Sequence, residues 1–469
     1  MSATAGGLYE GRQNAHARPS VNIRNRWLSE SFVDSGLPFR GQDSYVMNMM
    51  AYLHTASVLV FAITDTVYWL RLPDPELHEQ LEMPISSLNY RHLYPLITYL
   101  RRGFNKHLGG ELLMVSLKSG FVHLFLYRND YLSEIARIRN SGSGDDISIW
   151  SLALLRSRPI LATSSNTMLI ELVDLTELSE PRSLGFLSGH VHNIPSIDIS
   201  HDDQLLISAS IDGTARIWHI ASQTLLYTNV LEGPDVWGWA TMFFPIEYVS
   251  DASLYDSEYQ QRIALIEAPT SDEPIRSPID VLTMPLPAGI WPLLHGSRSS
   301  ITSRCLEAGY AESVSLNRHL GVFCNQMHLF LCNSRMHILD YYYICSDDCR
   351  RHSTFLFPGL RCRVILLRSI PELSLILFCC SRSTRLTMLR VVQLKSYYRL
   401  QFAGFLPTLP QASCSIIGLD ITYGPRTTTE CDHEDFWNIH MLYANGTLSC
   451  VEIQRDLQTR SLDLLPVLI

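Results

Sequence analysis

The segment that most constrains the fold of this chain covers residues 189–219 and reads GHVHNIPSIDISHDDQLLISASIDGTARIWH. It contains a Gly-His pair, two short runs in which apolar and polar residues alternate, an Asp-Gly turn and a tryptophan near its end. Alternation with a period of two is typical of a β-strand with one buried face, and Asp-Gly beside such runs is a strong hairpin signal. The segment therefore predicts a small antiparallel sheet.

The same segment resembles a WD repeat, which forms one four-stranded blade of a β-propeller. The resemblance implies a buried hydrogen-bonded relay of His, Ser or Thr, Asp and Trp that fastens the strands of the blade to one another. The matching residues here are His190, Ser208 or Ser210, Asp212 and Trp218. His219 stands where the motif usually has Asp. Because a relay of this kind performs no chemistry, it predicts architecture more than function.

A single blade cannot bury its own faces, so one repeat implies further blades elsewhere in the chain. Paired apolar runs that flank turn residues occur in segments 58–72, 111–130, 147–175, 320–343, 373–392 and 438–453. Together with segment 189–219 they make about seven units, a common number of propeller blades. The best helix candidate, residues 90–104, fits a strand and a loop nearly as well. We therefore predict an all-β fold, a seven-bladed WD40-like propeller over residues 43–455.

Three segments look unlike blades. Residues 1–42 have arginines among Ser, Asn and Gly and predict a flexible N-terminal arm. Residues 251–303 concentrate proline in APTSDEPIRSP and MPLPAGIWP and predict a long inserted loop. Residues 456–469 are expected to form a C-terminal tail. Inserts and termini often carry the individual function of a propeller, because recognition favours loops on a rigid frame.

The composition limits the classes of partner. Hydrophobic residues make up 46% of the chain and charged residues 18%, and the net charge is −9. A chain with this charge has no general electrostatic attraction for nucleic acid or an anionic membrane, so we expect neither. Lys106, Lys118 and Lys395 are the only lysines, and every other basic residue is Arg. Codon bias explains this choice, and arginine-mediated protein binding is the alternative.

The cysteines indicate a reducing compartment. Eleven of them, an odd number, lie between Cys305 and Cys450, and neither a signal peptide nor an apolar run of about 18 residues is apparent. We therefore expect a protein of the nucleus and/or cytoplasm without disulfides. The clusters Cys345-Cys349-His352 and Cys431-His433 lack the spacing of a structural zinc site, so we expect no metal. Asn445-Gly446-Thr447 is interpreted as a hairpin turn.

The sequence contains no phosphate loop, nucleophile elbow or HExxH motif, so we expect no cofactor and no enzymatic activity. Asp65, Asp212 and Asp435 are interpreted as turn formers. Propeller enzymes can nevertheless assemble a site from several blades around the channel. A cluster of acidic, His or Arg side chains at one mouth would favour an enzyme, and a mixed, partly apolar mouth would favour a binding module.

Several segments resemble the fungal family of WD-repeat regulators of ribonucleotide reductase gene transcription. They lie at residues 108–130, 147–167, 189–218, 236–245 and 370–381, and GHVHNIPS is the most specific of them. The resemblance implies a nuclear, non-enzymatic scaffold that binds proteins through its loops and channel mouth and acts in transcriptional control and the DNA damage response. The alternative is a substrate receptor of a cullin-type ubiquitin ligase. Many such receptors carry Arg four residues after the blade-closing Trp, where this chain has Ser222.

Overall fold

The structure is a computed structural model. It describes residues 21–28, 47–63, 66–71, 77–82, 97–129, 131–142, 147–232, 237–251, 302–307, 318–326, 328–344, 363–381, 383, 385–394, 397–406, 415–426, 434–444 and 446–455. The regular elements in this part of the chain are β-strands and single turns of 3-10 helix. None of its helical turns is long and apolar enough to cross a lipid bilayer.

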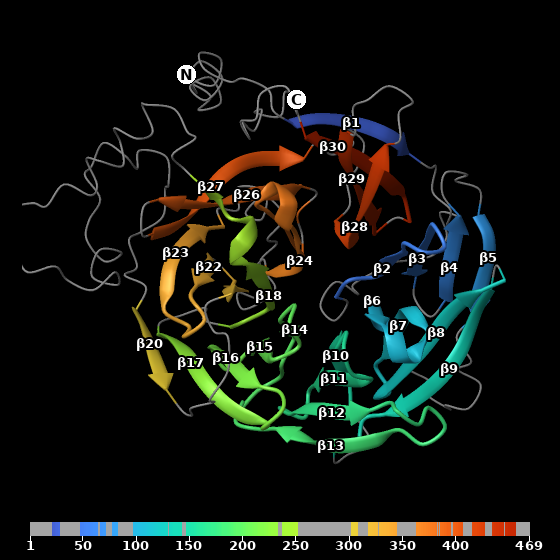
Figure 1. Ribbon diagram of the computed structural model, residues 1–469, viewed down its shortest axis with the longest axis horizontal. Coiled ribbons are helices and arrows are strands. Elements are labelled where there is room, and N and C mark those ends of the chain that lie inside the picture. The colour runs from blue at the N-terminus through green and yellow to red at the C-terminus, as the bar shows by residue number, and fades with distance from the viewer. Residues whose placement is uncertain are drawn as a thin grey trace, which may run out of the picture.

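Seven sheets stand around a central axis like the blades of a propeller (Figure 1). The strands β2, β6, β10, β14, β18, β24 and β28 lie innermost, one from each sheet. The prediction of an all-β, seven-bladed propeller is confirmed. The paired apolar runs found in the sequence coincide with neighbouring strands of one blade, as in β7 and β8 or β29 and β30.

We number the blades from one to seven in chain order. Blade 1 contains β2 (Met50–Leu53), β3 (Val58–Ile63), β4 (Thr66–Arg71) and β5 (Leu77–Glu82), and blade 2 contains β6 (Ile97–Asn105), β7 (Gly110–Leu117), β8 (Phe121–Arg128) and β9 (Tyr131–Arg139). Blade 3 contains β10 (Ile149–Leu154), β11 (Ile160–Ser165), β12 (Ile170–Asp174) and β13 (Arg182–Leu187). Blade 4 contains β14 (Ser196–Ile199), β15 (Leu205–Ala209), β16 (Thr214–His219), β17 (Thr224–Glu232) and β20 (Thr302–Glu307).

The remaining blades follow the same inside-to-outside order. Blade 5 contains β18 (Ala240–Pro245), β21 (His319–Cys324), β22 (His328–Cys332) and β23 (Ile338–Tyr343). Blade 6 contains β24 (Val364–Ile370), β25 (Leu375–Cys380), β26 (Leu386–Leu394), β27 (Tyr397–Leu406) and the short β19 (Ser250–Asp251), which pairs with β26 in parallel. Blade 7 contains β28 (Ile416–Arg426), β29 (Glu434–Tyr443) and β30 (Leu448–Arg455).

The ring is closed by a strand from the other end of the chain. β1 (Val21–Leu28) pairs antiparallel with β30 and forms the outer strand of blade 7, where blue β1 lies beside red β30 (Figure 1). The expectation of a flexible arm over residues 1–42 is therefore wrong for residues 21–28. Closure explains the difference, because pairing with β1 satisfies the backbone edge that β30 would otherwise expose. Residues 1–20, 29–46 and 456–469 lie outside the described residues.

The proline-rich insertion leaves and re-enters the propeller within blade 5, between β18 and β21. At its start β19 pairs with β26 of blade 6, and near its end β20 pairs with β17 as a fifth strand of blade 4. Residues 252–301, most of the predicted insertion, lie outside the described residues. Of the predicted helix candidate 90–104, residues 97–104 belong to β6, and residues 90–96 are not described.

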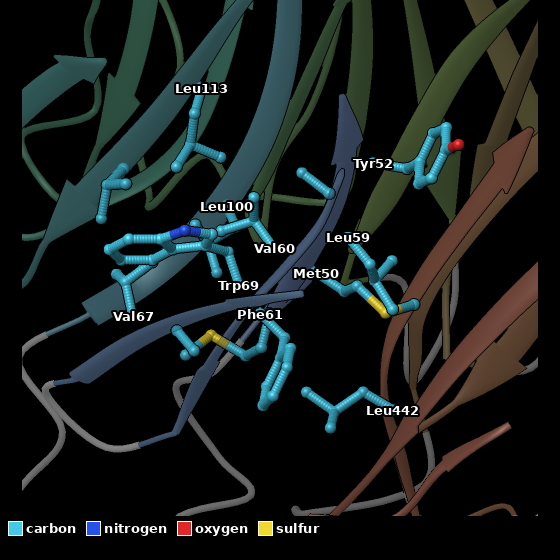
Figure 2. Close-up of a cluster of buried hydrophobic side chains, with 14 of the residues drawn as sticks. Met50, Tyr52, Leu59, Val60, Phe61, Val67, Trp69, Leu100, Leu113 and Leu442 are labelled. Carbon is cyan, nitrogen blue, oxygen red and sulfur yellow. The ribbon is translucent and has the colours of Figure 1, made fainter. Parts of the chain in front are cut away.

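Apolar side chains from neighbouring blades form the core at the seams between them. In blade 1, β3 reads VLVFAI and Val58, Leu59, Val60, Phe61 and Ala62 are all fully buried, because each face of a blade is covered by the next blade. Figure 2 shows this seam, where Leu100 and Leu113 of blade 2 approach Trp69, and Leu442 of blade 7 approaches Phe61. Burying one such side chain contributes about 1.5–3 kcal/mol. Apolar runs without strict alternation thus encode these central strands.

Candidate functional site

The predicted relay residues of blade 4 meet in one hydrogen-bonded chain. Asp212 Oδ2 lies 2.8 Å from His190 Nδ1, and His190 Nε2 lies 2.8 Å from Ser208 Oγ. Trp218 Nε1 donates to the same Ser208 Oγ at 2.9 Å. The chain connects the loop before β14 to β15, to the β15–β16 turn and to β16. It therefore links these four parts of the blade through side chains.

The partners in these hydrogen bonds indicate which atoms carry the protons. A carboxylate only accepts, so His190 donates from Nδ1 to Asp212, and its bare Nε2 accepts from the Ser208 hydroxyl. Burial lowers the pKa of His190, although Asp212 opposes that shift. Burial alone would raise the pKa of Asp212, but hydrogen bonds from His190 and Thr214 outweigh it and hold that pKa well below its usual range. The pair is thus a neutral imidazole beside an ionised carboxylate.

Ser210 lies outside this chain, which decides between the two predicted serines. Its hydroxyl contacts the carbonyl oxygens of His192 and Asn193 at 3.1 and 2.9 Å and accepts from the Asp212 backbone N–H at 3.1 Å. Ser210 therefore shapes the loop and turn next to the relay. The hydroxyl that accepts the hydrogen bond from Trp218 Nε1 is that of Ser208.

The two positions at which blade 4 departs from expected motifs lie together on the surface. His219 Nδ1 lies 2.6 Å from Ser222 Oγ, which in turn lies 2.7 Å from Thr224 Oγ1. Ser222 is exposed in the β16–β17 turn and offers a hydroxyl where a ligase receptor would offer a guanidinium.

A cavity of about 800 Å³ lies along the propeller axis, lined by residues from the inner strands of all seven blades. It includes residues at the ends of inner strands and in the turns that follow them, such as Phe104, Arg156, His201, Tyr248 and Glu372. We call this end of the channel the exit mouth. The sequence predicts a channel mouth but does not indicate which residues line it.

Two aspartates on inner strands join blades across this channel. Asp198 of β14 accepts from Arg101 Nη2 of β6 at 2.5 Å and from the Phe243 backbone N–H of β18 at 3.0 Å. Asp420 of β28 accepts from the Tyr52 backbone N–H of β2 at 2.7 Å, and Arg368 Nε lies 4.0 Å from its other oxygen. Each carboxylate therefore receives a backbone donor from the next blade and faces an arginine from another blade.

The patterns described above do not predict this arrangement, although the amino-acid sequence contains a signal of it. Both aspartates stand in an apolar-Asp-Ile tripeptide of an inner strand, Ile197-Asp198-Ile199 of β14 and Leu419-Asp420-Ile421 of β28. A charged residue repeated at one position of inner strands indicates a role in joining blades. Asn48 acts similarly between blades 7 and 2, because its Oδ1 accepts from Leu419 N at 2.8 Å and its Nδ2 donates to Leu100 O at 3.2 Å.

Other acidic side chains at the exit mouth are also engaged by backbone donors. Glu111 Oε2 accepts from both the N–H and the hydroxyl of Thr55 at 2.8 Å. Asp203 accepts from the backbone N–H groups of Arg156 and Ser157 at 3.0 and 2.6 Å. These carboxylates orient turns and neighbouring blades, an arrangement that suits structure better than proton transfer.

Three aromatic side chains are exposed at the same mouth, on three different blades. Phe104 of β6 is 53% exposed, Tyr423 of β28 is 49% exposed, and Tyr248, which follows β18, is 39% exposed. Large exposed rings near charged groups are typical of surfaces that bind proteins. The mouth is therefore mixed and partly apolar.

The metal candidates named from the sequence, Cys345, Cys349, His352, Cys431 and His433, lie outside the described residues, as do Asp65 and Asn445. Among the residues that are described, no group of three or more His, Cys, Asp or Glu side chains is placed to hold a metal ion. No disulfide joins the six cysteines in the same part of the chain.

Comparison with known proteins agrees with this architecture. The model of the WD domain, G-beta repeat, matches residues 181–219, which span β13 to β16 and contain the relay. Residues 181–219 therefore match one WD repeat, and the chain folds as a seven-bladed β-propeller.

Two relatives match part of the chain at low identity. A WD40 repeat-containing protein of Dictyostelium discoideum is 28% identical over 208 residues, which cover 44% of this chain and 29% of that protein. The ribosome biogenesis protein YTM1 of Scheffersomyces stipitis is 26% identical over 121 residues, or 25% of this chain and 26% of that protein. The chain thus matches less than a third of the length of these relatives.

Among solved structures, a chain in the crystal structure of the mitotic checkpoint complex is similar, with a TM-score of 0.52 and 11% identity over 94% of this chain and 93% of that one. At this level of identity, the similarity shows a shared fold.

Proposed function

We propose that this protein is a non-enzymatic scaffold that binds protein partners at the exit mouth of its channel and on its loops. One observation carries the proposal: the channel carboxylates Asp198 and Asp420 hold blades together, while Phe104, Tyr248 and Tyr423 are left exposed around the mouth. A rigid ring that presents aromatic side chains on several blades suits recognition of a protein surface.

The biological setting of this scaffold follows from the family resemblance. Segments such as GHVHNIPS resemble the fungal WD-repeat regulators of ribonucleotide reductase transcription, so we propose that the protein acts in the nucleus on the expression of those genes. The exposed Ser222 gives no support to the ligase-receptor alternative, because its hydroxyl cannot replace the charge and the fork of donors of an arginine.

Affinity capture tests the scaffold. The full chain is used as bait in nuclear extract and compared with a variant that carries Phe104→Ala, Tyr248→Ala and Tyr423→Ala. A matched control replaces Tyr131, Phe186 and Phe402, which are exposed on outer strands, with Ala. We expect the mouth variant to lose most partner signal by mass spectrometry, and the control variant to retain it. Equal retention by both variants would contradict binding at the mouth.

Deletion of the gene tests the setting. Ribonucleotide reductase transcripts should change under replication stress in the deletion strain and recover on expression of the wild-type chain. Unchanged transcripts would remove the regulatory role and leave the scaffold in place. If the purified protein converts a small molecule and channel variants lose this activity, the protein is an enzyme and the proposal of a non-enzymatic scaffold is wrong.

A further inference from the structure

A local concentration of positive charge lies beside the exit mouth, on blades 2 and 3. We call it the basic rim, and it consists of Lys106, Arg128, Arg156 and Arg158, all exposed. Lys106 lies in the β6–β7 turn, and Arg156 and Arg158 lie in the β10–β11 turn. Arg128 is the last residue of β8, and its guanidinium lies beside Gly109 of the β6–β7 turn. A Cβ atom at position 109 would lie 3.0 Å from Arg128 Nη2.

The two turns of the basic rim are held to each other by buried hydrogen bonds. Asn105 Nδ2 donates to the carbonyl oxygens of Leu155 and Arg158 at 2.8 and 2.6 Å, and its Oδ1 accepts from the His107 and Leu108 backbone N–H groups. Asn105 is fully buried. Positively charged side chains from two blades are therefore presented by one preformed frame, which lowers the entropy lost on binding.

Within the described residues, no carboxylate forms an ion pair with any of the four side chains of the basic rim. The nearby Glu111 faces Arg102 at 3.6 Å and accepts from Thr55, and Asp203 is 5% exposed and accepts from backbone N–H groups. The chain has a net charge of −9, so the positive charge of the basic rim is opposite in sign to the charge of the chain as a whole.

The basic rim is continuous with apolar surface at the mouth. Phe104 directly precedes the capping Asn105 and is 53% exposed, and Arg156 and Phe104 both line the channel. A ligand bound to the cations can therefore place an apolar side chain on Phe104 at the channel entrance. Charge at the rim and an aromatic ring at the centre together suit a ligand that is both acidic and apolar.

We propose that the basic rim binds an acidic segment of a protein partner, with its carboxylates on Lys106, Arg156 and Arg158 and an apolar side chain against Phe104. This inference rests on the proposed scaffold function and names the chemistry of its partner. A short acidic peptide fits better than nucleic acid, because a long polyanion would extend beyond the rim of a chain whose net charge is −9. At physiological salt, a peptide confined to the rim feels mainly charges within about 8 Å.

A direct binding test uses a short labelled peptide of alternating Glu and Leu with an acetylated N-terminus. We expect Arg156→Glu with Arg158→Glu to weaken its binding about tenfold or more in fluorescence anisotropy, which corresponds to about 1.4 kcal/mol. The matched control is Arg182→Glu with Arg335→Glu, two exposed arginines away from the mouth, which should retain wild-type affinity. Affinity for the wild type should also fall as salt rises.

The scarcity of lysine provides a positional test. A carbodiimide activates a peptide carboxyl, and attack by a lysine amine forms an amide and releases the reagent as a urea. Lys106 precedes β7 and Lys118 follows it, so the two lysines mark opposite ends of blade 2. Peptide mapping of the modified lysine therefore shows at which end the peptide was bound. The coupled peptide should be found on Lys106. Coupling should decrease in the Arg156→Glu, Arg158→Glu variant, although this variant keeps Lys106.

The outcomes separate this inference from the function on which it rests. Peptide coupling at Lys118 alone, or equal peptide affinity in rim and control variants, overturns the basic rim. Single-stranded DNA that binds the rim more tightly than the peptide overturns it in favour of nucleic acid. Partners that are captured equally by the rim variant and the wild type refute the acidic ligand but keep the scaffold. A wild-type bait without any specific partner refutes the scaffold itself.

Discussion

Blades 3 and 4 are neighbours, and they use different residues to attach an incoming loop to their strands. In both, the loop arriving from the preceding blade must be tied to the second and third strands. Blade 4 uses His190 to reach Ser208 and uses Asp212 to accept from the Val191 backbone N–H. Blade 3 places Asn140 Nδ2 2.9 Å from Thr163 Oγ1, and Glu171 accepts from the Ser141 backbone N–H at 2.9 Å.

The two arrangements occupy equivalent places. Thr163 is the fourth residue of β11 and Ser208 is the fourth residue of β15, and in each case a side chain from the incoming loop meets that hydroxyl. Glu171 stands on β12 directly opposite Thr163, whereas Asp212 precedes its strand. Each blade therefore needs buried donors and acceptors that are all hydrogen-bonded, and the WD relay is one of several arrangements that meet this need.

Asp212→Ala should show the largest effect. It removes the acceptor for His190, for Val191 N–H and for both donors of Thr214, so we expect a loss of about 3 kcal/mol in the free energy of unfolding. Thermal and urea unfolding measure it. The matched control is Asp174→Ala, because Asp174 also accepts from the backbone and hydroxyl of a threonine two residues later but lies at an exposed turn. Similar losses in both variants would contradict a special role for the relay.

Glu171→Ala should have the next largest effect. The buried carboxylate receives both the backbone N–H and the hydroxyl of Ser141, so its removal leaves these donors unpaired and should cost about 2 kcal/mol. Glu177→Ala, an exposed carboxylate with one 3.4 Å contact to Ser179, is the control and should be near neutral. If Glu171→Ala is as mild as this control, the equivalence of the two blades fails.

Acidification should distinguish the blades, because blade 4 has a histidine where blade 3 has Asn140. Burial lowers the pKa of His190, so its contribution to stability is complete above the unfolded pKa of about 6.5 and is lost as pH falls, by up to about 1.4 kcal/mol per pH unit. The depressed pKa of Asp212 adds a similar loss below about pH 3.9.

His190→Asn introduces the blade 3 residue and removes the histidine part of this acid sensitivity. Its unfolding free energy should fall less steeply than that of the wild type between about pH 6.5 and 5. His328 and His440, whose pKa values burial lowers to about 4, remain in the variant and provide the common background. Parallel pH profiles for variant and wild type would show that His190 does not titrate with folding.

Ser222→Ala should have the smallest effect. Its hydroxyl contacts His219 and Thr224 at an exposed turn, where water replaces lost bonds, so we expect a change below about 0.5 kcal/mol in chemical denaturation. Ser208→Ala is its buried counterpart and should cost more, because it leaves Trp218 Nε1–H and His190 Nε2 without their partner. Equal effects would remove burial as the reason that the relay matters.

The relay could be predicted because its residues follow a recurring motif within one short segment. Its equivalents in blade 3 could not, because Asn140, Thr163 and Glu171 form no recurrent motif and become partners only through strand register. The strand β1 could not be predicted from the sequence for a related reason. A register shift between Asn25 and Trp27 interrupts its alternation, so Val21–Leu28 does not look like a regular strand until it pairs with β30.

The sequence by itself determined the fold class and the number of blades, because apolar runs separated by turn residues depend on local chemistry that repeats along the chain. The contacts between polar residues, in contrast, depend on the tertiary structure. Arg101 and Asp198 stand on β6 and β14, with all of blade 3 between them in the ring, and they touch because both point into the channel. The basic rim likewise exists only because Asn105 joins turns of two blades. Periodicity reports the environment of each strand, whereas contacts between blades depend on the closed ring.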